Sequence, residues 1–95
     1  MMSQIPINFE KVAKKDLDRE ILRVGIIAEL DAINLYEQMA AATQNGDLKK
    51  VLLEIAKEEK THVGEFQAFL LAEDREQVRE LAEGKKEVDE LTKSK

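Results

Sequence analysis

The sequence predicts an all-α protein in which two long helices form an antiparallel hairpin and a shorter helix follows. Along two long stretches, apolar residues recur at alternating steps of three and four, which places them on one face of a helix. Asn45-Gly46-Asp47 separates these stretches with a strong turn signal. Only 4% of the residues are aromatic, and Ala, Leu, Glu and Lys dominate, as is typical of helical proteins. We expect a single domain over residues 1–95.

The first segment, residues 1–15, is expected to be an irregular amino-terminal arm. Pro6 disfavours the helical conformation for Ile5. Ile5, Ile7 and Phe9 lie close enough in the sequence to pack together on a helical bundle. A disordered tail is the alternative.

The first long helix is expected over residues 16–44, with Asp16 or Asp18 as its N-cap. Its seam consists of Leu22, Ile26, Glu29, Ile33, Tyr36 and Ala40. Gly25 lies inside the helix, where glycine costs up to about 1 kcal/mol relative to alanine, so we expect another helix to cross closely there. Polar residues off the seam are expected to face water or an oligomer contact: Asp31, Asn34, Glu37 and Gln38.

The second long helix is expected over residues 47–73, with Asp47 as its N-cap and Gly46 ending the first helix. Its seam consists of Leu48, Leu52, Ile55, Glu59, His62, Phe66 and Phe69. Further apolar residues widen the stripe, so more than one neighbour should pack against it: Val51, Ala56, Val63 and Leu70. Gly64 indicates a second close approach by another backbone.

The third helix is expected over residues 75–92. Asp74 opens it, and Gln77 follows three residues later in a capping-box arrangement. Its apolar stripe is thinner and consists of Val78, Leu81, Ala82, Val88 and Leu91. Gly84 interrupts the stripe and could break the helix. The segment should either fold back over the hairpin or reach a neighbouring molecule.

Three polar residues interrupt the seams of the two long helices. Glu59 and His62 are three residues apart, so they share one helix face. Folding the chain at the turn brings Glu29 opposite them, at a height of roughly 20–25 Å from the turn. A charge in an apolar seam costs several kcal/mol unless it is paired or bound to a metal. Glu-x-x-His projecting into a helix bundle is the ligand pattern of di-iron carboxylate sites, so the sequence predicts a metal site here.

Each of these residues also has a simpler interpretation. His62 could be a hydrogen-bonded core histidine, and Glu59 a carboxylate that reaches water from a packed surface. Glu58, four residues before His62, could be the facing acid instead, although the seam count favours Glu59. Tyr36 lies two turns from Glu29 on the same stripe, where a core aromatic is at least as reasonable as a redox role.

One chain supplies two carboxylates and one imidazole, whereas a di-iron bundle needs two Glu-x-x-His helices and two more glutamates. Two copies would supply that set, and a chain of this size is expected to associate in any case. We therefore predict a symmetric homodimer with the metals on its axis. Carboxylates and imidazole without thiolate suit iron or manganese, with zinc as a substitute.

Composition excludes several other classes. The chain contains no cysteine, which excludes disulfides, zinc-thiolate sites and iron–sulfur or rubredoxin centres within it. A formal net charge of −5 argues against a general nucleic-acid binder and suits attraction of cations. No apolar run approaches the length of a membrane span, and no signal-peptide core is found. We expect a cytoplasmic protein without a nucleic-acid or membrane partner.

The chain resembles the encapsulated ferritin-like proteins, which are half-length relatives of ferritin and rubrerythrin. It is especially similar to the ferritin-like domain joined to the shell protein in some archaeal encapsulins. The similar stretches are Ile27-Ala28-Glu29-Leu30-Asp31-Ala32-Ile33-Asn34-Leu35-Tyr36-Glu37 and Glu58-Glu59-Lys60-Thr61-His62-Val63-Gly64-Glu65-Phe66, with weaker similarity from Glu76 to Leu91. Glu-x-x-His alone is weakly specific, but the whole pattern at this separation is strong.

The resemblance implies that two hairpins dimerise into a ferritin-like four-helix bundle and bind a di-iron centre between them. It implies a ferroxidase that oxidises Fe(II) with dioxygen for storage inside an encapsulin shell, and a larger ring of dimers, expected to be a decamer. By the same resemblance Glu29, Glu59 and His62 are the ligands, and Tyr36 is an aromatic beside the centre. Asp31 matches an acidic position that helps iron to reach the site.

The chain departs from its relatives at two positions near the site. Ala28 and Leu35 stand where relatives carry a second acid and a tryptophan. The carboxyl end shows no obvious apolar shell-docking peptide, which fits a cut domain or a fusion partner.

Two other functions compete with the ferroxidase. One is a helical-hairpin oligomerisation module whose buried polar residues only fix the register of the helices. The other is a rubrerythrin-like peroxidase, which the missing cysteines make less favoured.

Overall fold

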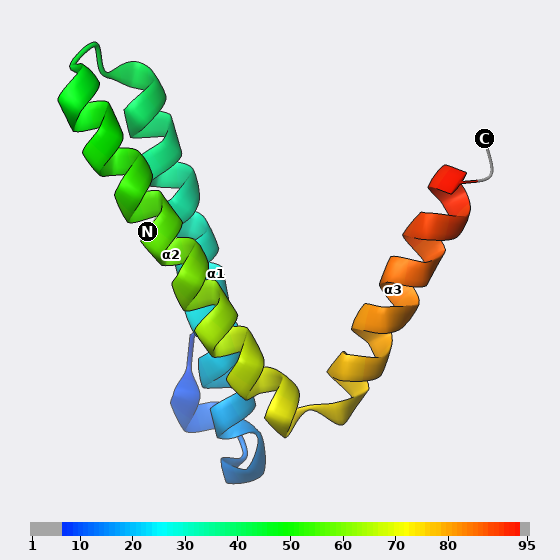
Figure 1. Ribbon diagram of the computed structural model, residues 1–95. Helices are drawn as coiled ribbons and strands as arrows, with labels where there is room; N and C mark the ends of the chain where they lie inside the picture. Colours follow the sequence, from blue (N-terminus) through cyan, green and yellow to red (C-terminus); the bar gives the residue numbers. More distant parts are fainter. Residues whose placement is uncertain (1–6, 94–95) are drawn as a thin grey trace.

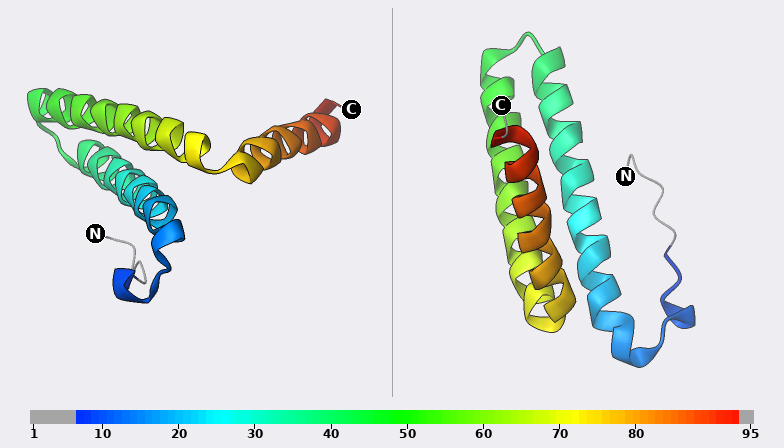
Figure 2. Two further views of the ribbon diagram at one scale, coloured as in Figure 1. Left: turned by 90° about the horizontal axis from the view of Figure 1, so that it is seen from below. Right: turned by 90° about the vertical axis from the view of Figure 1, so that its right-hand side faces the viewer.

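The structure is a computed structural model that describes residues 7–93. Over these residues it consists of a short 3-10 helix, η1 (Phe9–Lys11), and three α-helices, α1 (Lys14–Ala42), α2 (Gly46–Glu73) and α3 (Arg75–Lys93). α1 and α2 lie side by side and antiparallel, and α3 leaves the far end of α2 at an angle (Figures 1 and 2). The predicted all-α fold, a long hairpin followed by a shorter helix, is confirmed.

The expected amino-terminal arm is described only in part. Ile5 and Pro6 lie outside the described residues. Ile7 is 45% exposed and Phe9 is 41% exposed, so these two apolar side chains do not pack closely on the chain. Phe9 begins η1 instead.

α1 begins without a side-chain cap. Its N-cap is Ala13, in extended backbone, and no side chain accepts a hydrogen bond there. The prediction that Asp16 or Asp18 caps this helix is therefore wrong. Asp16 lies inside the first turn, where its N–H donates to the carbonyl of Ala13 at 2.9 Å. Its carboxylate can still favour the positive end of the helix, but through charge rather than through a capping hydrogen bond.

Asn45, and not Asp47, caps α2. Asn45 Oδ1 accepts hydrogen bonds from the N–H groups of Asp47 at 3.0 Å and Leu48 at 3.1 Å. Asparagine caps a helix as well as aspartate does. Because α2 already begins at Gly46, the residue before it, Asn45, is the N-cap. Gly46 is the first residue of α2 and does not end α1, which was also predicted wrongly. α1 ends at Ala42, and the N–H of its C-cap residue, Thr43, donates to the carbonyl of Met39.

The core lies between α1 and α2. The buried apolar side chains of the described residues are Leu22, Ile33 and Ala40 of α1 and Leu52, Ala56 and Leu70 of α2. They come from the predicted seams or directly beside them. Gly25 lies against the ring of Phe66, which confirms the close crossing expected there. At Gly64 a built Cβ would meet no atom of the described chain within 4 Å, so the close approach expected there does not come from another helix of the same copy.

The hairpin leaves much of its apolar surface uncovered. Exposed apolar residues on α1 and α2 are Ile21, Ile27, Leu30, Leu35, Met39, Leu48, Val51, Leu53 and Phe69. A single hairpin has one inner face, so the stripe that widens beyond the seam has nothing to pack against in one copy. No helix of the described part of the chain is long and apolar enough to cross a membrane.

Asp74 forms the elbow between α2 and α3. Its N–H donates to the carbonyl of Leu70, and its Oδ1 accepts from the N–H of Gln77 at 3.0 Å, as the predicted cap requires. Its Oδ2 also pairs with Arg23 Nη2 of α1 at 3.1 Å. The hydrogen bond from Gln77 lowers the pKa of the Asp74 carboxyl; burial opposes this, while Arg23 and Arg19 reinforce it. Asp74 thus closes α2 through its backbone N–H, while its side chain caps α3 and pairs with α1.

α3 is one continuous helix that points away from the hairpin (Figure 1). It passes through Gly84 without a break, so the predicted interruption is wrong. The penalty of an internal glycine is at most about 1 kcal/mol, and Lys85 Nζ pairs with Asp89 Oδ2 at 2.8 Å in the next turn. Of its described residues none is buried. Of the two directions considered, the helix follows the one that leads away from its own hairpin.

Candidate metal centre

The structure brings Glu29, Glu59 and His62 together. Each offers one ligand atom, and the three atoms lie within 4.8 Å of one another. His62 Nδ1 is 3.4 Å from Glu29 Oε2 and 3.5 Å from Glu59 Oε2. The imidazole nitrogen therefore faces one carboxylate from each helix.

Helix geometry alone accounts for this convergence. Glu59 and His62 are one turn apart on the same face of α2. Glu29 lies on the facing side of α1, because the hairpin turn places the two seams opposite each other. The side chains of both glutamates are 19% exposed, whereas that of His62 is 45% exposed. The cluster is therefore covered on the carboxylate side and open at the imidazole.

Glu29 Oε2 is buried and has no hydrogen-bond partner among the described residues. Its 3.4 Å contact with His62 Nδ1 is an ion-pair contact that does not have the geometry of a hydrogen bond. A buried polar atom without a partner costs about 1–3 kcal/mol, so its presence needs an explanation. A bound cation is the natural partner of such an oxygen. Two carboxylate oxygens and one imidazole nitrogen form a donor set that suits Fe(II), Mn(II) or Zn(II).

Glu58 does not join the cluster. It is exposed, and the group of carboxylates and histidine that can share an ion contains Glu59 instead. The seam count had favoured Glu59 for this position. Glu58 points aside because it lies one residue, and so about 100°, around the helix from its neighbour.

Tyr36 and Asp31 are not in the cluster. Tyr36 is half-buried on α1, two turns and so about 10 Å from Glu29 along the helix axis. Asp31 is only 7% exposed, so the expectation that it faces water or an oligomer contact is wrong. It has an interaction partner, and a carboxylate held in this way is already buried in the single chain. Any role of Asp31 in guiding iron would start from a buried position.

Sequence reasoning missed two ion pairs that frame the hairpin. Lys60 Nζ of α2 reaches Glu37 Oε2 of α1 at 3.2 Å, and both side chains are exposed. Arg23 and Asp74 join the other end of the hairpin to the elbow. Opposite charges at facing heptad positions could have indicated the first pair. The second depends on the direction of α3, which local spacing does not specify.

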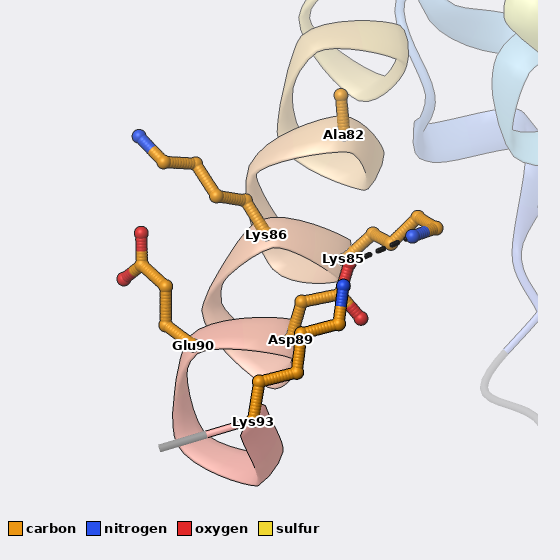
Figure 3. Close-up of a pocket in the computed structure, with 6 residues that line it drawn as sticks. All are labelled: Ala82, Lys85, Lys86, Asp89, Glu90 and Lys93. Atoms are coloured by element: carbon orange, nitrogen blue, oxygen red, sulfur yellow. Dashed lines mark hydrogen bonds and ion pairs between the residues drawn. The ribbon is translucent and has the colours of Figure 1, made fainter.

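A hollow of about 510 Å³ lies along α3, away from this cluster. Figure 3 shows its lining residues, Ala82, Lys85, Lys86, Asp89, Glu90 and Lys93. All belong to a single helix, and lysines alternate with carboxylates around it. The hollow therefore lies between exposed side chains of a single helix and is not an enclosed pocket. Glu29, Glu59 and His62 do not line it.

The fold and the cluster together define a class of protein: helical hairpins that present a glutamate from one helix and a Glu-x-x-His pair from the other. The model of the rubrerythrin family, described as Rubrerythrin, matches residues 20–94. The chain belongs to this family.

Two individual proteins are similar to the chain over most of its length. The chain is 58% identical over 86 residues to the ferritin-like-encapsulin shell fusion protein of Pyrococcus furiosus, which covers 90% of this chain and 25% of the relative. It is 41% identical over 69 residues to the encapsulin nanocompartment cargo protein EncC of Myxococcus xanthus, covering 70% of this chain and 53% of the relative. The chain thus spans about a quarter of one relative and about half of the other.

A solved structure gives the same result for the fold. The crystal structure of the encapsulated ferritin domain from Pyrococcus furiosus matches with a TM-score of 0.84 and 55% sequence identity, over 97% of this chain and 96% of that one. The predicted resemblance to encapsulated ferritin-like proteins is confirmed.

Proposed function

We propose that this chain is a ferroxidase: two copies bind Fe(II) between them, oxidise it to Fe(III) with dioxygen, and release it for storage inside an encapsulin shell. The cluster of Glu29, Glu59 and His62, with its buried and unpartnered carboxylate oxygen, carries the proposal. The family match and the names of the relatives support the same reading.

Two copies are needed because one cluster is half a site. Two carboxylates and one imidazole are too few for two metal ions, whereas a symmetric pair supplies four carboxylates, whose charge balances two divalent cations. The side chain of His62 is 45% exposed, so a second copy could bring its own ligands to this cluster. The uncovered apolar residues of α1 and α2 give such a copy a surface to bury.

The role of the chain's own residues is to hold two iron ions close together and to favour the higher oxidation state. Carboxylate oxygens are anionic and hard, so they stabilise Fe(III) more than Fe(II). Two Fe(II) ions give up one electron each, and dioxygen takes both electrons with two protons to leave as hydrogen peroxide. Iron is the substrate in this scheme.

Assembly and location are proposed from the relatives. One of them is named as a fusion with an encapsulin shell protein and another as an encapsulin cargo protein. We propose an encapsulin shell as the partner of this chain, the interior of that compartment as its location, and a larger ring of dimers, with a decamer as the expected size.

Anaerobic addition of Fe(II) followed by rapid mixing with dioxygen tests the function. Wild type should bind about one Fe(II) per chain, or two per dimer, and form Fe(III) rapidly. Glu59→Ala and His62→Ala should abolish rapid oxidation, while the matched control Glu58→Ala should retain it. Full-affinity binding by dilute, separated monomers would contradict the shared site.

The same preparation separates the two alternatives. The family match makes a rubrerythrin-like peroxidase the second candidate, and it predicts that hydrogen peroxide oxidises the bound Fe(II) much faster than dioxygen does. An oligomerisation module predicts association with no metal bound at all. Metal analysis with native mass measurement distinguishes that case.

A further inference from the structure

We infer that the contact between Phe66 and the backbone at Gly25 sets the spacing of the two ligand-bearing helices, and so acts as a positioning device for the metal cluster. This inference rests on the proposed metal binding by Glu29, Glu59 and His62, but not on the oxidation step. It assigns a function to two residues outside the ligand set.

The contact lies one helical turn from the cluster on both helices. Gly25 precedes Glu29 by four residues on α1, and Phe66 follows His62 by four residues on α2. Residues four apart lie above one another on the same helix face. A change in helix separation at the Gly25–Phe66 level therefore reaches Glu29 and His62 within one turn.

Of the four glycines, only Gly25 lies against a side chain of the described residues. A Cβ at Gly25 would lie 3.1 Å from Cε1 and Cζ and 3.2 Å from Cδ1 of Phe66. At Gly46, Gly64 and Gly84 an added Cβ would meet nothing of the described chain within 4 Å. The Phe66 ring thus occupies the space that a side chain at position 25 would need.

This arrangement makes helix separation depend on the size of two side chains. The distance between packed helices is set by the residues at their contact. Here one residue is the smallest possible and the other is a rigid aromatic ring. A methyl group at position 25 requires the ring or the helix to give by a few tenths of an ångström.

Metal coordination is sensitive to displacements of that size. Ligand distances in metal sites are expected to stay within about 0.2 Å of their normal values. The contacts of His62 Nδ1 with Glu29 and Glu59, at 3.4 and 3.5 Å, lie in the same gap between α1 and α2. A wider gap would draw Glu29 away from the two ligands on α2, which would move together.

The experiment compares Gly25→Ala with Gly64→Ala. Both remove an internal helix glycine and gain the same helix propensity, but only the first meets a side chain. Co(II) affinity is measured by competition with a chelator, together with the visible absorption of bound Co(II), which reports ligand geometry. Thermal unfolding of the metal-free proteins and their mass by light scattering are measured alongside.

We expect Gly64→Ala to bind Co(II) as wild type does and Gly25→Ala to bind about tenfold or more weakly, with a changed absorption spectrum. Phe66→Leu, which leaves a gap instead of a clash, should also weaken binding. The double variant Gly25→Ala with Phe66→Leu should recover most of the lost affinity, because the added methyl group fills part of the vacated space. Phe66→Leu and the double variant still test the inference if Gly25→Ala does not fold.

The failures can be told apart. If wild type binds Co(II) and Gly25→Ala binds equally well with the same spectrum, the ring simply moves aside and the positioning role is wrong, while the metal site stands. Additive losses in the double variant would overturn the inference in the same way. If wild type binds no Co(II), Fe(II) or Zn(II), the proposed function fails, and the positioning role fails with it.

Discussion

The hairpin and α3 are both long amphipathic helical segments, but they are stabilised by different means. Every buried apolar side chain among the described residues belongs to α1 or α2. In α3 no described residue is buried, and Leu91 on its apolar stripe is 74% exposed. The hairpin is held by contacts within the chain, whereas α3 relies on its cap and on pairs such as Lys85–Asp89.

The difference shows which parts of the fold one copy can stabilise alone and which apolar surfaces need a partner molecule to cover them. Most of the stability of a helix in a protein comes from packing of its apolar face, and none of the described residues of α3 is packed in this way within one copy. The apolar stripe of α3 is therefore a surface that another molecule could cover. The candidate metal cluster differs from α3 in this respect, because Glu29, Glu59 and His62 converge within one hairpin. In our proposal a second copy then completes the site.

The largest expected effect comes from removing a buried side chain of the hairpin. Leu52 is 6% exposed, so Leu52→Ala should lower the free energy of unfolding by about 2–5 kcal/mol. Leu91→Ala on α3 should change it by no more than about 0.5 kcal/mol. Urea unfolding at equal protein concentration measures both. A comparable loss from Leu91→Ala would mean that α3 is buried in solution and that the contrast between the two regions does not hold.

The next effect is produced by metal at the cluster. A cation at about 100 times its dissociation constant should raise the free energy of unfolding by about 2.7 kcal/mol. Glu29→Leu should abolish that increase and raise the stability of the metal-free chain by about 1–3 kcal/mol, since it removes the unpartnered oxygen. Thermal scans with and without Zn(II) measure this. Equal metal stabilisation in wild type and Glu29→Leu would place the ion elsewhere.

The elbow connects the two regions, so Asp74 should affect α3 more than the hairpin. Asp74→Ala removes the hydrogen bond to the Gln77 N–H and the pair with Arg23. Backbone amides at the start of α3 should then exchange hydrogen faster, while those in the middle of α1 and α2 keep their protection. Asp89→Ala, which removes only the pair with Lys85, is the control. Equal loosening of all three helices would show that the elbow and the hairpin unfold together.

The elbow should also respond to acid. The folded-state pKa of Asp74 is lowered from 3.8, so its stabilising contribution is fully present above about pH 3.8 and is lost as pH falls through the lowered value. Hydrogen exchange of α3 between pH 5 and 3 should therefore show little loosening until the lower end of this range. In Asp74→Ala this pH dependence should disappear.

The smallest effect is expected at Gly84, inside α3. Gly84→Ala meets no side chain and should add up to about 1 kcal/mol of local helix stability. Far-ultraviolet circular dichroism should show a small gain in helix content, and metal affinity should not change. A loss of helix would indicate that α3 needs the glycine for a contact with another copy.

The long helices and the cluster could be predicted because they depend on spacing alone. Steps of three and four place Glu29, Glu59 and His62 on facing seams, and the turn between the helices sets their common height. The residue at which α2 starts was harder to predict. Asn45 and Asp47 are both good N-caps, and only the path of the backbone decides between them. The burial of Asp31 could not be read from its position off the seam.

The direction of α3 also lay beyond local patterns. It accompanies the pairing of Arg23 with Asp74, residues 51 positions apart in the sequence. Gly84 was misleading for a different reason. A glycine lowers helix propensity by a modest amount, which the rest of a 19-residue helix can offset.

Selection for stability alone would act against Glu29. Its buried oxygen weakens the metal-free chain, and an apolar residue of similar size would strengthen it. In a library of variants ranked by heat resistance in a chelator, position 29 should drift toward leucine or methionine. In the same ranking with Fe(II) present, glutamate should persist, because binding outweighs its cost. The composition of the surviving population would then report, without any purified protein, whether a cation is the partner that this oxygen lacks.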